Sequence, residues 1–265
     1  SAMFAFYGTL ILKSFRTQSA YRVNLLITMV SGLLILFVQA SVWQSLYGQG
    51  DLVAGVSFAQ TITYVVINVF LRSLRIMPGN AIGNAVYTGR LGEDMLRPVN
   101  LALLNVASQL GQGMFFTVFL AMPTAVLGAL LFGFLPPASA MALLLFAISA
   151  LLGAAIFAIF DLTAGYMAFW LTGDWFVSWF EEALISLFGG TLLPIWFYPD
   201  WLSRVCDWLP FKYISFSAID IYLGRVAVAD AALVLLIQLG WIAILLGLER
   251  LIWSAAQRKI TVQGG

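Results

Sequence analysis

The sequence has few of the residues that most often bind metals or act as acids and bases. It contains no histidine and a single cysteine, Cys206. A disulfide within the chain and a Cys/His metal cluster are therefore excluded. Catalysis by a histidine acid or base is excluded as well.

Charge is also scarce. Only 9% of the residues are charged while 62% are hydrophobic, and the mean hydropathy is +0.97. Several uncharged runs reach the roughly 20 residues that a helix needs to cross a hydrocarbon layer about 30 Å thick. The thirteen Lys and Arg residues lie at the ends of apolar runs and form no single patch, so no nucleic-acid partner is expected. The composition predicts a membrane protein.

Six spans are predicted from these runs. The first covers residues 23–50, and the second covers 52–71 and ends at Arg72 and Arg75. After it, Pro78-Gly79 predicts a helix break followed by a loop. The uncharged stretch 98–160 is too long for one crossing, and "GFLPPAS" divides it into a third and a fourth span. The fifth span begins near Trp175 and ends at "GGTLLP", and the sixth covers about 226–248.

Two further segments are amphipathic. In residues 3–22 an apolar face opposes a polar face, which predicts a helix lying in the membrane interface. The alternative is the front end of a longer spanning helix. Residues 196–225 contain "WFYPDWLSRVCDWLP", in which Trp201, Val205 and Trp208 share one face, as in a short helix on or dipping into the outer interface. The predicted fold class is an all-α membrane protein of six transmembrane helices with these two additions.

The basic residues predict the orientation of the chain. Six spans place both termini on one side, and cytoplasmic loops carry an excess of Lys and Arg. Ten basic residues fall on the side of the termini: Lys13, Arg16, Arg22, Arg72, Arg75, Arg90, Arg97, Arg250, Arg258 and Lys259. Arg204, Lys212 and Arg225 fall on the other. Both termini are therefore expected in the cytosol, together with segment 89–98.

Segment 89–98 concentrates charge in a chain that has little. In "RLGEDMLR", Arg90, Glu93, Asp94 and Arg97 fall on one helical face. Pairs along such a helix contribute only about 0.2 to 0.5 kcal/mol each, which does not explain the placement. A helix that docks a soluble partner is one interpretation, because charge pattern sets register and partner choice. A solvated loop is the other.

The chain resembles the permease subunits of type-2 ABC transporters, in the subgroup of multidrug or viologen-type exporter permeases. The resemblance rests on several strings in order: "SAYRVN", "LRPVN", "MAFWLT", "LPFKYISFSAIDIYLGR" and "TVQGG". It implies that 3–22 is an elbow helix, that 89–98 is the coupling helix, with Arg90, Glu93, Asp94 and Arg97 as its charged residues, and that 196–225 forms re-entrant outer helices. One permease domain would then comprise spans one and two (23–88), the coupling helix, spans three to five (99–195), the outer helices, and span six with a cytosolic tail (226–265).

The resemblance also implies partners and a function. Two permease subunits, identical or homologous, would join two ATP-binding subunits in a bacterial inner membrane and export a hydrophobic or amphipathic substrate. ATP and Mg would be bound by the partner, since no GxxxxGK[ST] phosphate loop occurs in this sequence. The chain itself is expected to be non-catalytic and to hold no cofactor or metal.

Polar residues inside the spans are candidates for the translocation pathway, because they are expensive in hydrocarbon. They are Asn68, Asp161, Asp174, Glu181 and Glu182. Asn68 and Asp161 have an alternative role in hydrogen bonds between helices, and Glu181 and Glu182 one at a helix N-terminus. A competing hypothesis is an ion-coupled secondary transporter that uses Asp161 or Glu181. An intramembrane enzyme is a third, which lacks a plausible nucleophile and base pair.

Overall fold

The structure is a computed structural model that describes residues 2–18, 22–48, 52–75, 77–88, 101–171 and 175–258. The chain is mostly helical. Within the described ranges, four helical segments are long and apolar enough to cross a membrane: Leu25–Tyr47, Ala102–Phe132, Ala140–Phe169 and Val228–Gln257. The predicted second and fifth spans form shorter helices, so the count of six spans stays a prediction.

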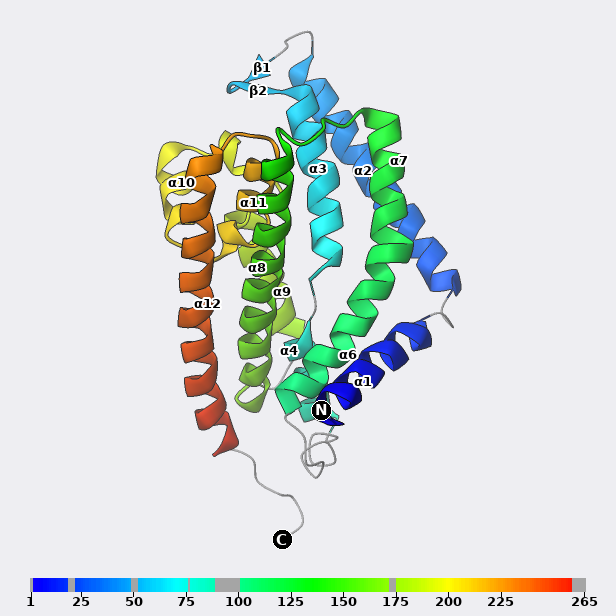
Figure 1. Ribbon diagram of the computed structural model, residues 1–265, viewed down its shortest axis with the longest axis vertical. Coiled ribbons are helices and arrows are strands. Elements are labelled where there is room, and N and C mark those ends of the chain that lie inside the picture. Colours follow the sequence, from blue (N-terminus) through cyan, green and yellow to red (C-terminus); the bar gives the residue numbers. More distant parts are fainter. Residues whose placement is uncertain are drawn as a thin grey trace.

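The N-terminal helix α1 (Ala2–Gln18) lies across the lower end of the molecule and packs against α6 (Leu101–Phe116) (Figure 1). Gly111 allows this contact, because a Cβ at that position would lie 2.2 Å from the backbone oxygen of Ile11. The long helix α2 (Arg22–Tyr47) follows α1. The start of α1 and the end of the last helix, α12 (Val228–Gln257), lie at the same end of the molecule.

The second apolar run is not helical from its start. Strands β1 (Leu52–Val53) and β2 (Val56–Ser57) form a small hairpin at the opposite end, and helix α3 (Phe58–Ser73) begins only after it. The Ser57 hydroxyl accepts a hydrogen bond from the Gln60 backbone N–H, and the Gln60 side chain accepts one from the Ser57 N–H. This capping box fixes the start of α3. The helix ends at Ser73 and so has 16 residues, or about 24 Å.

The prediction of a loop directly after Pro78-Gly79 is wrong for residues 78–87, which are helical. Helix α4 (Pro78–Tyr87) begins at Pro78. Proline breaks a helix interior but suits its first turn, because the missing N–H would have no helical partner there. A helix break is present, but it lies before Pro78, because α3 ends at Ser73 and α4 begins at Pro78.

The third and fourth predicted spans are separated as expected. Helix α6 continues through a π-helical stretch, η1 (Thr117–Ala121), into α7 (Met122–Phe132). The chain turns at Gly133, whose φ of 87° favours glycine, and α8 (Ala140–Gly165) returns toward the other end. A 3₁₀ turn, η2 (Tyr166–Phe169), extends α8.

The last part of the chain contains the short helices between the fifth and sixth predicted spans. Helix α9 (Trp175–Phe188) has 14 residues, about 21 Å, and ends at Gly189-Gly190. The short helices η3 (Ile195–Phe197), α10 (Asp200–Asp207), η4 (Phe211–Tyr213) and α11 (Phe216–Tyr222) follow. In Figure 1 they lie beside the upper half of α8 and α12. Helix α12 runs to Gln257, past the predicted stop near residue 248, and packs along α8.

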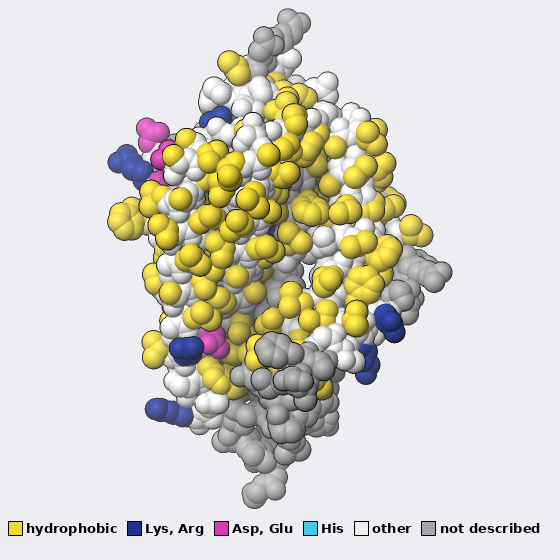
Figure 2. All heavy atoms as spheres, in the orientation of Figure 1, with side chains coloured by type: hydrophobic (Ala, Val, Ile, Leu, Met, Phe, Trp, Pro, Cys, Tyr) yellow, Lys and Arg dark blue, Asp and Glu magenta, His cyan; other side chains and the backbone are white. Residues whose placement is uncertain are grey.

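The surface separates hydrophobic from charged side chains. Figure 2 shows hydrophobic side chains over most of the height of this face and the coloured charges toward its two ends. Exposed large hydrophobic residues are frequent on α2, which includes Ile27, Leu34 and Phe37. A continuous apolar surface of this kind suits contact with lipid.

Candidate functional site

The predicted docking residues lie outside the described part of the chain. Two segments outside the described residues contain predicted site residues. Segment 89–100 contains Arg90, Glu93, Asp94 and Arg97, and segment 172–174 contains Asp174. Their roles stay predictions. The flanking helices are described: α4 ends at Tyr87, immediately before this segment, and α6 begins at Leu101 after it.

Asp161, on α8, caps the N-terminus of α4. Its carboxylate oxygen Oδ2 accepts a hydrogen bond of 2.6 Å from the backbone N–H of Gly79, and the residue is only 3% exposed. The residue at the N-cap position of α4, Met77, makes no side-chain cap. The first N–H groups of a helix need an acceptor, so Asp161 supplies from another helix what a local cap residue normally supplies. This is the structural role that the sequence left open.

Two glycines bring α4 and α8 into backbone contact at the same place. A Cβ on Gly79 would lie 1.7 Å from the backbone oxygen of Asp161, and a Cβ on Gly165 would lie 2.2 Å from the backbone oxygen of Gly79. No larger residue fits either position without moving the helices. The start of α4 is therefore fixed to α8 by both a hydrogen bond and close packing.

Glu181, on α9, faces the same carboxyl group. It is 8% exposed, and its side chain lies near enough to that of Asp161 for the two carboxyl groups to interact electrostatically. Its oxygen Oε1 has no hydrogen-bond partner among the described residues. Asp161 and Glu181, separated by 20 positions in the sequence, thus form one buried carboxyl pair that joins α4, α8 and α9.

Glu182 has a different role from its neighbour. Its carboxylate forms an ion pair of 2.8 Å with the guanidinium of Arg72 at the end of α3, and both side chains are partly exposed. Successive residues on a helix point in different directions, so Glu181 lies inside the bundle and Glu182 near its surface. The structure brings both glutamates close to the end of α3, but not to one common site.

Arg75 is a buried residue that the sequence interpretation missed. It is 8% exposed, and none of its three guanidinium nitrogens has a hydrogen-bond partner among the described residues. The guanidinium lies 5.5 Å from the centre of the Phe157 ring, in a cation–π contact. From the sequence, Arg75 is interpreted only as one of the basic residues that indicate the orientation of the chain in the membrane. Its position before a helix break gave no signal that it would point inward.

Asn68 lies on α3, one turn before Arg72. Its Nδ2 donates a long hydrogen bond of 3.4 Å to the backbone oxygen of Thr191, which follows α9. One turn earlier, Tyr64 donates a hydrogen bond of 2.8 Å from its hydroxyl to the backbone oxygen of Gly190. Asn68 therefore joins α3 to the chain after α9, as one of its two predicted roles required.

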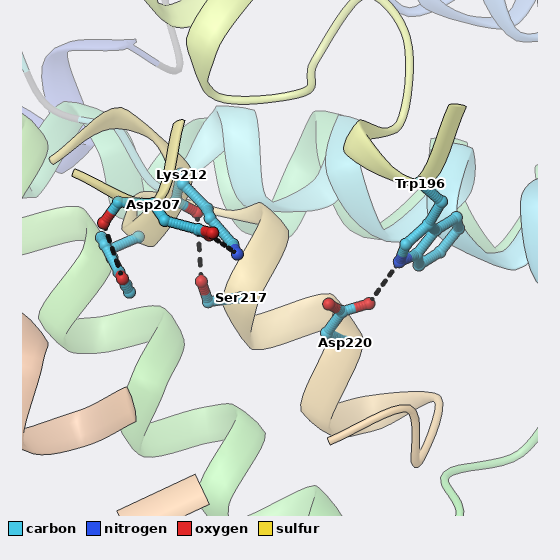
Figure 3. Close-up of polar contacts among 6 residues, drawn as sticks. Trp196, Asp207, Lys212, Ser217 and Asp220 are labelled. Carbon is cyan, nitrogen blue, oxygen red and sulfur yellow. Dashed lines mark hydrogen bonds and ion pairs between the residues drawn. The ribbon is translucent and has the colours of Figure 1, made fainter. Parts of the chain in front are cut away.

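Four charged side chains of the outer segment 189–227 have close partners: Asp207, Lys212, Asp220 and Arg225. The Trp196 indole N–H donates a hydrogen bond of 2.7 Å to Asp220, as Figure 3 shows, and Arg225 lies 3.9 Å from the same carboxylate. Lys212 pairs with Asp207. Burial raises the pKa of Asp220 to about 6. This value is the net result, because the hydrogen bond from Trp196 and the positive charges of Arg225 and Lys212 oppose the effect of burial on the pKa.

These observations define a class of protein. Long apolar helices, an apolar surface with charges toward its ends, and buried polar groups that join separate helices are the features of a multi-pass membrane protein.

A family comparison identifies the class further. Residues 26–264 match the model of the ABC-2 family transporter proteins, and the chain belongs to this family. It is a membrane component of a transport system, and its family pairs in general with an ABC ATPase subunit. No curated protein and no solved structure matches the chain.

Proposed function

We propose that this chain is the membrane-spanning permease subunit of an ABC exporter. A separate ATPase subunit would bind ATP and Mg and supply the energy. The observation that carries the proposal is membership of the ABC-2 family in a chain whose sequence has no phosphate loop of its own.

The finer features follow the sequence predictions. The exporter would belong to the multidrug or viologen-type subgroup and would move a hydrophobic or amphipathic substrate out of the cytosol or the inner leaflet. A second permease subunit would complete the pathway in a bacterial inner membrane, with six spans and both termini in the cytosol. The ten basic residues on the side of the termini support this orientation.

The contacts of α4 suggest how ATPase movement would reach the bundle. Segment 89–98 would dock on the ATPase through Arg90, Glu93, Asp94 and Arg97. Helix α4 enters this segment directly, and Asp161 holds the first turn of α4 to α8. Glu181, which lies on α9, is buried and interacts electrostatically with Asp161. A displacement of the docking segment would therefore move α8 and α9 together with α4, and nucleotide would favour one arrangement of the bundle over the other.

The proposal is tested by co-expressing the chain with the ATP-binding subunit encoded beside it. Co-purification and the ATPase rate are measured for the native chain and for the double variant Glu93→Lys, Asp94→Lys. We expect a stable native complex, and loss of binding or of rate stimulation in the variant, because reversed charges oppose docking. A matched double variant on the outer side, Asp200→Lys and Asp230→Lys, changes two exposed carboxylates and controls for the change in net charge. Failure of the native chain to bind any ATPase would contradict the proposal.

The buried carboxyl pair is the observation that favours a second candidate function. Asp161 and Glu181 are both buried and interact electrostatically inside the protein, and carboxyl chains relay protons in ion-coupled transporters. A secondary transporter would work without ATP and would stop when a protonophore removes the proton gradient. An ATP-driven exporter would stop without ATP and would continue to work when a protonophore removes the proton gradient.

A further inference from the structure

A polar pocket lies between α4 and α6, the two helices that flank segment 89–98. Its volume is about 500 Å³, which falls in the range of small-molecule sites, about 300–1,000 Å³. Both helices reach the end of the molecule where α1 begins and α12 ends (Figure 1). The lining of the pocket includes four carboxamide side chains: Asn80, Asn84, Asn105 and Gln109.

The four carboxamides form two rows, one on each helix. Asn80 and Asn84 are four residues apart on α4, and Asn105 and Gln109 are four residues apart on α6. Residues at this spacing share a helical face, with about 5–6 Å between their Cβ atoms. The two residues of α4 are exposed, and the two residues of α6 are partly exposed. All four therefore remain accessible to a molecule in the pocket.

Most of this hydrogen-bonding capacity is not used by the protein. The side chains of Asn80, Asn84 and Gln109 make no hydrogen bond to another residue in the described part of the chain. Each carboxamide offers two N–H donors and one oxygen acceptor. The pocket thus presents several free donors and acceptors from two helices.

A solvated helix surface is the simpler explanation, and the composition of the two helices argues against it. Neither α4 nor α6 contains a charged residue, whereas the polar face of a surface helix is normally rich in charge. Asparagine is also a weak helix former, yet three of the six asparagines in the sequence line this pocket. Uncharged hydrogen-bonding groups gathered in this way indicate a binding site.

The lining favours a neutral, hydroxyl-bearing ligand. No charged residue belongs to the part of the lining that the structure describes, so none there offsets the cost of removing an ion from water. A hydroxyl group both donates and accepts hydrogen bonds, and it can therefore pair with either end of a carboxamide. Several hydroxyl groups on one sugar ring or polyol can pair with amides that lie one helical turn apart.

The two helices are held by different neighbours. Asp161 and the close approach at Gly79 fix α4 to α8. The Ser14 and Ser108 hydroxyls share a hydrogen bond of 3.2 Å that, with the close approach at Gly111, fixes α6 to α1. A ligand that binds both rows of carboxamides links these two pairs of helices. Because α4 and α6 flank segment 89–98, the ligand also fixes the two ends of that segment.

We infer that the pocket between α4 and α6 binds the neutral, hydroxyl-rich head group of an amphipathic molecule that carries a sugar or a polyol. Its occupancy holds α4 and α6 together and so strengthens docking of the ATPase on segment 89–98. The inference names the head group of the substrate in the proposed export function, and it rests on that function for the effect on the ATPase.

The test uses photoreactive probes on the full chain in nanodiscs, without the ATPase. One probe is a dodecyl glycerol ether with a diazirine next to its head group, and the second is the same molecule with both hydroxyl groups methylated. We expect the hydroxyl probe to label α4 or α6 about three- to tenfold more strongly than the methylated probe, as expected for one hydrogen bond. The double variant Asn84→Leu, Gln109→Leu removes one amide from each helix and should reduce this preference to below about twofold.

Two glutamines on α6 provide a matched control. Gln109 lines the pocket, whereas Gln112 does not belong to its described lining, and both are partly exposed. Gln109→Leu should lower the preference for the hydroxyl probe, and Gln112→Leu should leave it unchanged. Equal labelling of the native chain by both probes, a preference that survives the double variant, or labelling mapped to other helices would overturn the inference.

The complex with the ATPase gives a second readout. The hydroxyl probe should lower the Kd of the complex about fivefold or more relative to the methylated probe, because the ligand and the ATPase favour the same arrangement of α4 and α6. The double variant should remove this effect. A Kd that does not depend on the probe would overturn the link between the pocket and docking.

The two readouts separate this inference from the proposed function. Labelling does not need the ATPase, so a failed ATPase complex leaves the pocket intact, and failed labelling leaves the ATPase complex intact. A resident lipid and a transported molecule share the required head-group chemistry. Adding the ATPase and ATP should lower the labelling if the molecule is transported, and unchanged labelling would overturn the placement of the pocket in the transport pathway.

Discussion

The outer segment 189–227 and the region around the start of α4 differ in whether their charged groups have partners. In the outer segment, Asp220 has both a hydrogen-bond donor and a nearby cation, and Asp207 is paired with Lys212. Around α4, Glu181 leaves one oxygen and Arg75 leaves its whole guanidinium without a hydrogen-bond partner among the described residues.

This difference indicates which region has reason to change shape. Paired groups stabilise one arrangement of the helices. Buried unpaired groups are unfavourable, and any rearrangement that supplies a partner lowers the free energy. Arg75 interacts electrostatically with both Glu181 and Glu182. We therefore expect the outer segment to stay rigid during transport, and the contacts among Arg75, Glu181 and Glu182 to be exchanged. The following predictions test this comparison.

The largest effect is expected at the contact between α4 and α8. Gly79→Ala places a methyl group 1.7 Å from a backbone oxygen, so the helices must separate. We expect a loss of about 3 kcal/mol or more of unfolding free energy, at the upper end for overpacking, and weaker ATPase coupling. Thermal unfolding followed by tryptophan fluorescence measures the first effect.

Gly83→Ala is the matched control for this prediction. It lies one turn further along α4, and its Cβ would meet the nearest atom, the Ala168 Cβ, at an ordinary 3.8 Å. Its Tm should equal or exceed that of the native chain, because alanine favours helix over glycine. Equal Tm values for Gly79→Ala and Gly83→Ala would show that the tight contact does not exist.

The second effect is a pH dependence in the outer segment. The folded-state pKa of Asp220 is raised from 3.8 to about 6, so the folded protein binds a proton more strongly than the unfolded chain. The stabilising contribution of the protonated form is complete below about pH 4 and is lost as the pH rises through about 6, with a magnitude of at most about 3 kcal/mol.

Asp220→Asn isolates this contribution, because the amide oxygen still accepts from Trp196 but does not titrate. The Tm of the native chain minus that of the variant should fall between about pH 4 and pH 7. A difference that rises with pH would show that the pairing with Arg225 outweighs burial.

The third effect concerns the cap that Asp161 provides. Asp161→Ala removes the acceptor of the Gly79 N–H and should lower the unfolding free energy by about 1–2 kcal/mol, as lost N-caps do. Asp161→Asn keeps an oxygen at the same position and should retain most of the stability. If the asparagine variant is as unstable as the alanine variant, the charge and not the hydrogen bond holds α4.

The smallest effect is expected for the ion pair between Arg72 and Glu182. Both side chains are partly exposed, and such pairs contribute about 0–1 kcal/mol. A double-mutant cycle with Arg72→Gln and Glu182→Gln measures the coupling energy. A coupling above about 2 kcal/mol would mean that the pair is buried in the working assembly.

Part of the fold is predictable because it depends on local signals. Gly133 and the two prolines after it divide two spans in both the sequence and the structure, and Gly189-Gly190 ends α9. The start of α3 is also predictable from the sequence, because Ser57 and Gln60 have the spacing of a capping box. The start of α4 is not predicted, because proline both breaks a helix and suits its first turn, and the local sequence does not decide between the two.

The polar contacts of the bundle could not be predicted in the same way. Asp161 and Gly79 are 82 residues apart, and nothing in either local sequence indicates that they meet. Asp161, Glu181, Glu182 and Asn68 stand out in the sequence as polar residues in apolar runs, but their partners depend on how the helices pack. Arg75 was missed for the same reason.

The most direct test of the account is the source of energy for transport. The chain and its ATPase are placed in proteoliposomes with a fluorescent dodecyl glycerol ether, and its movement across the bilayer is followed by dithionite quenching. The account predicts movement that starts on addition of ATP and continues in the presence of a protonophore. Movement that needs a proton gradient and ignores ATP, or the absence of ATP-dependent movement, would contradict it.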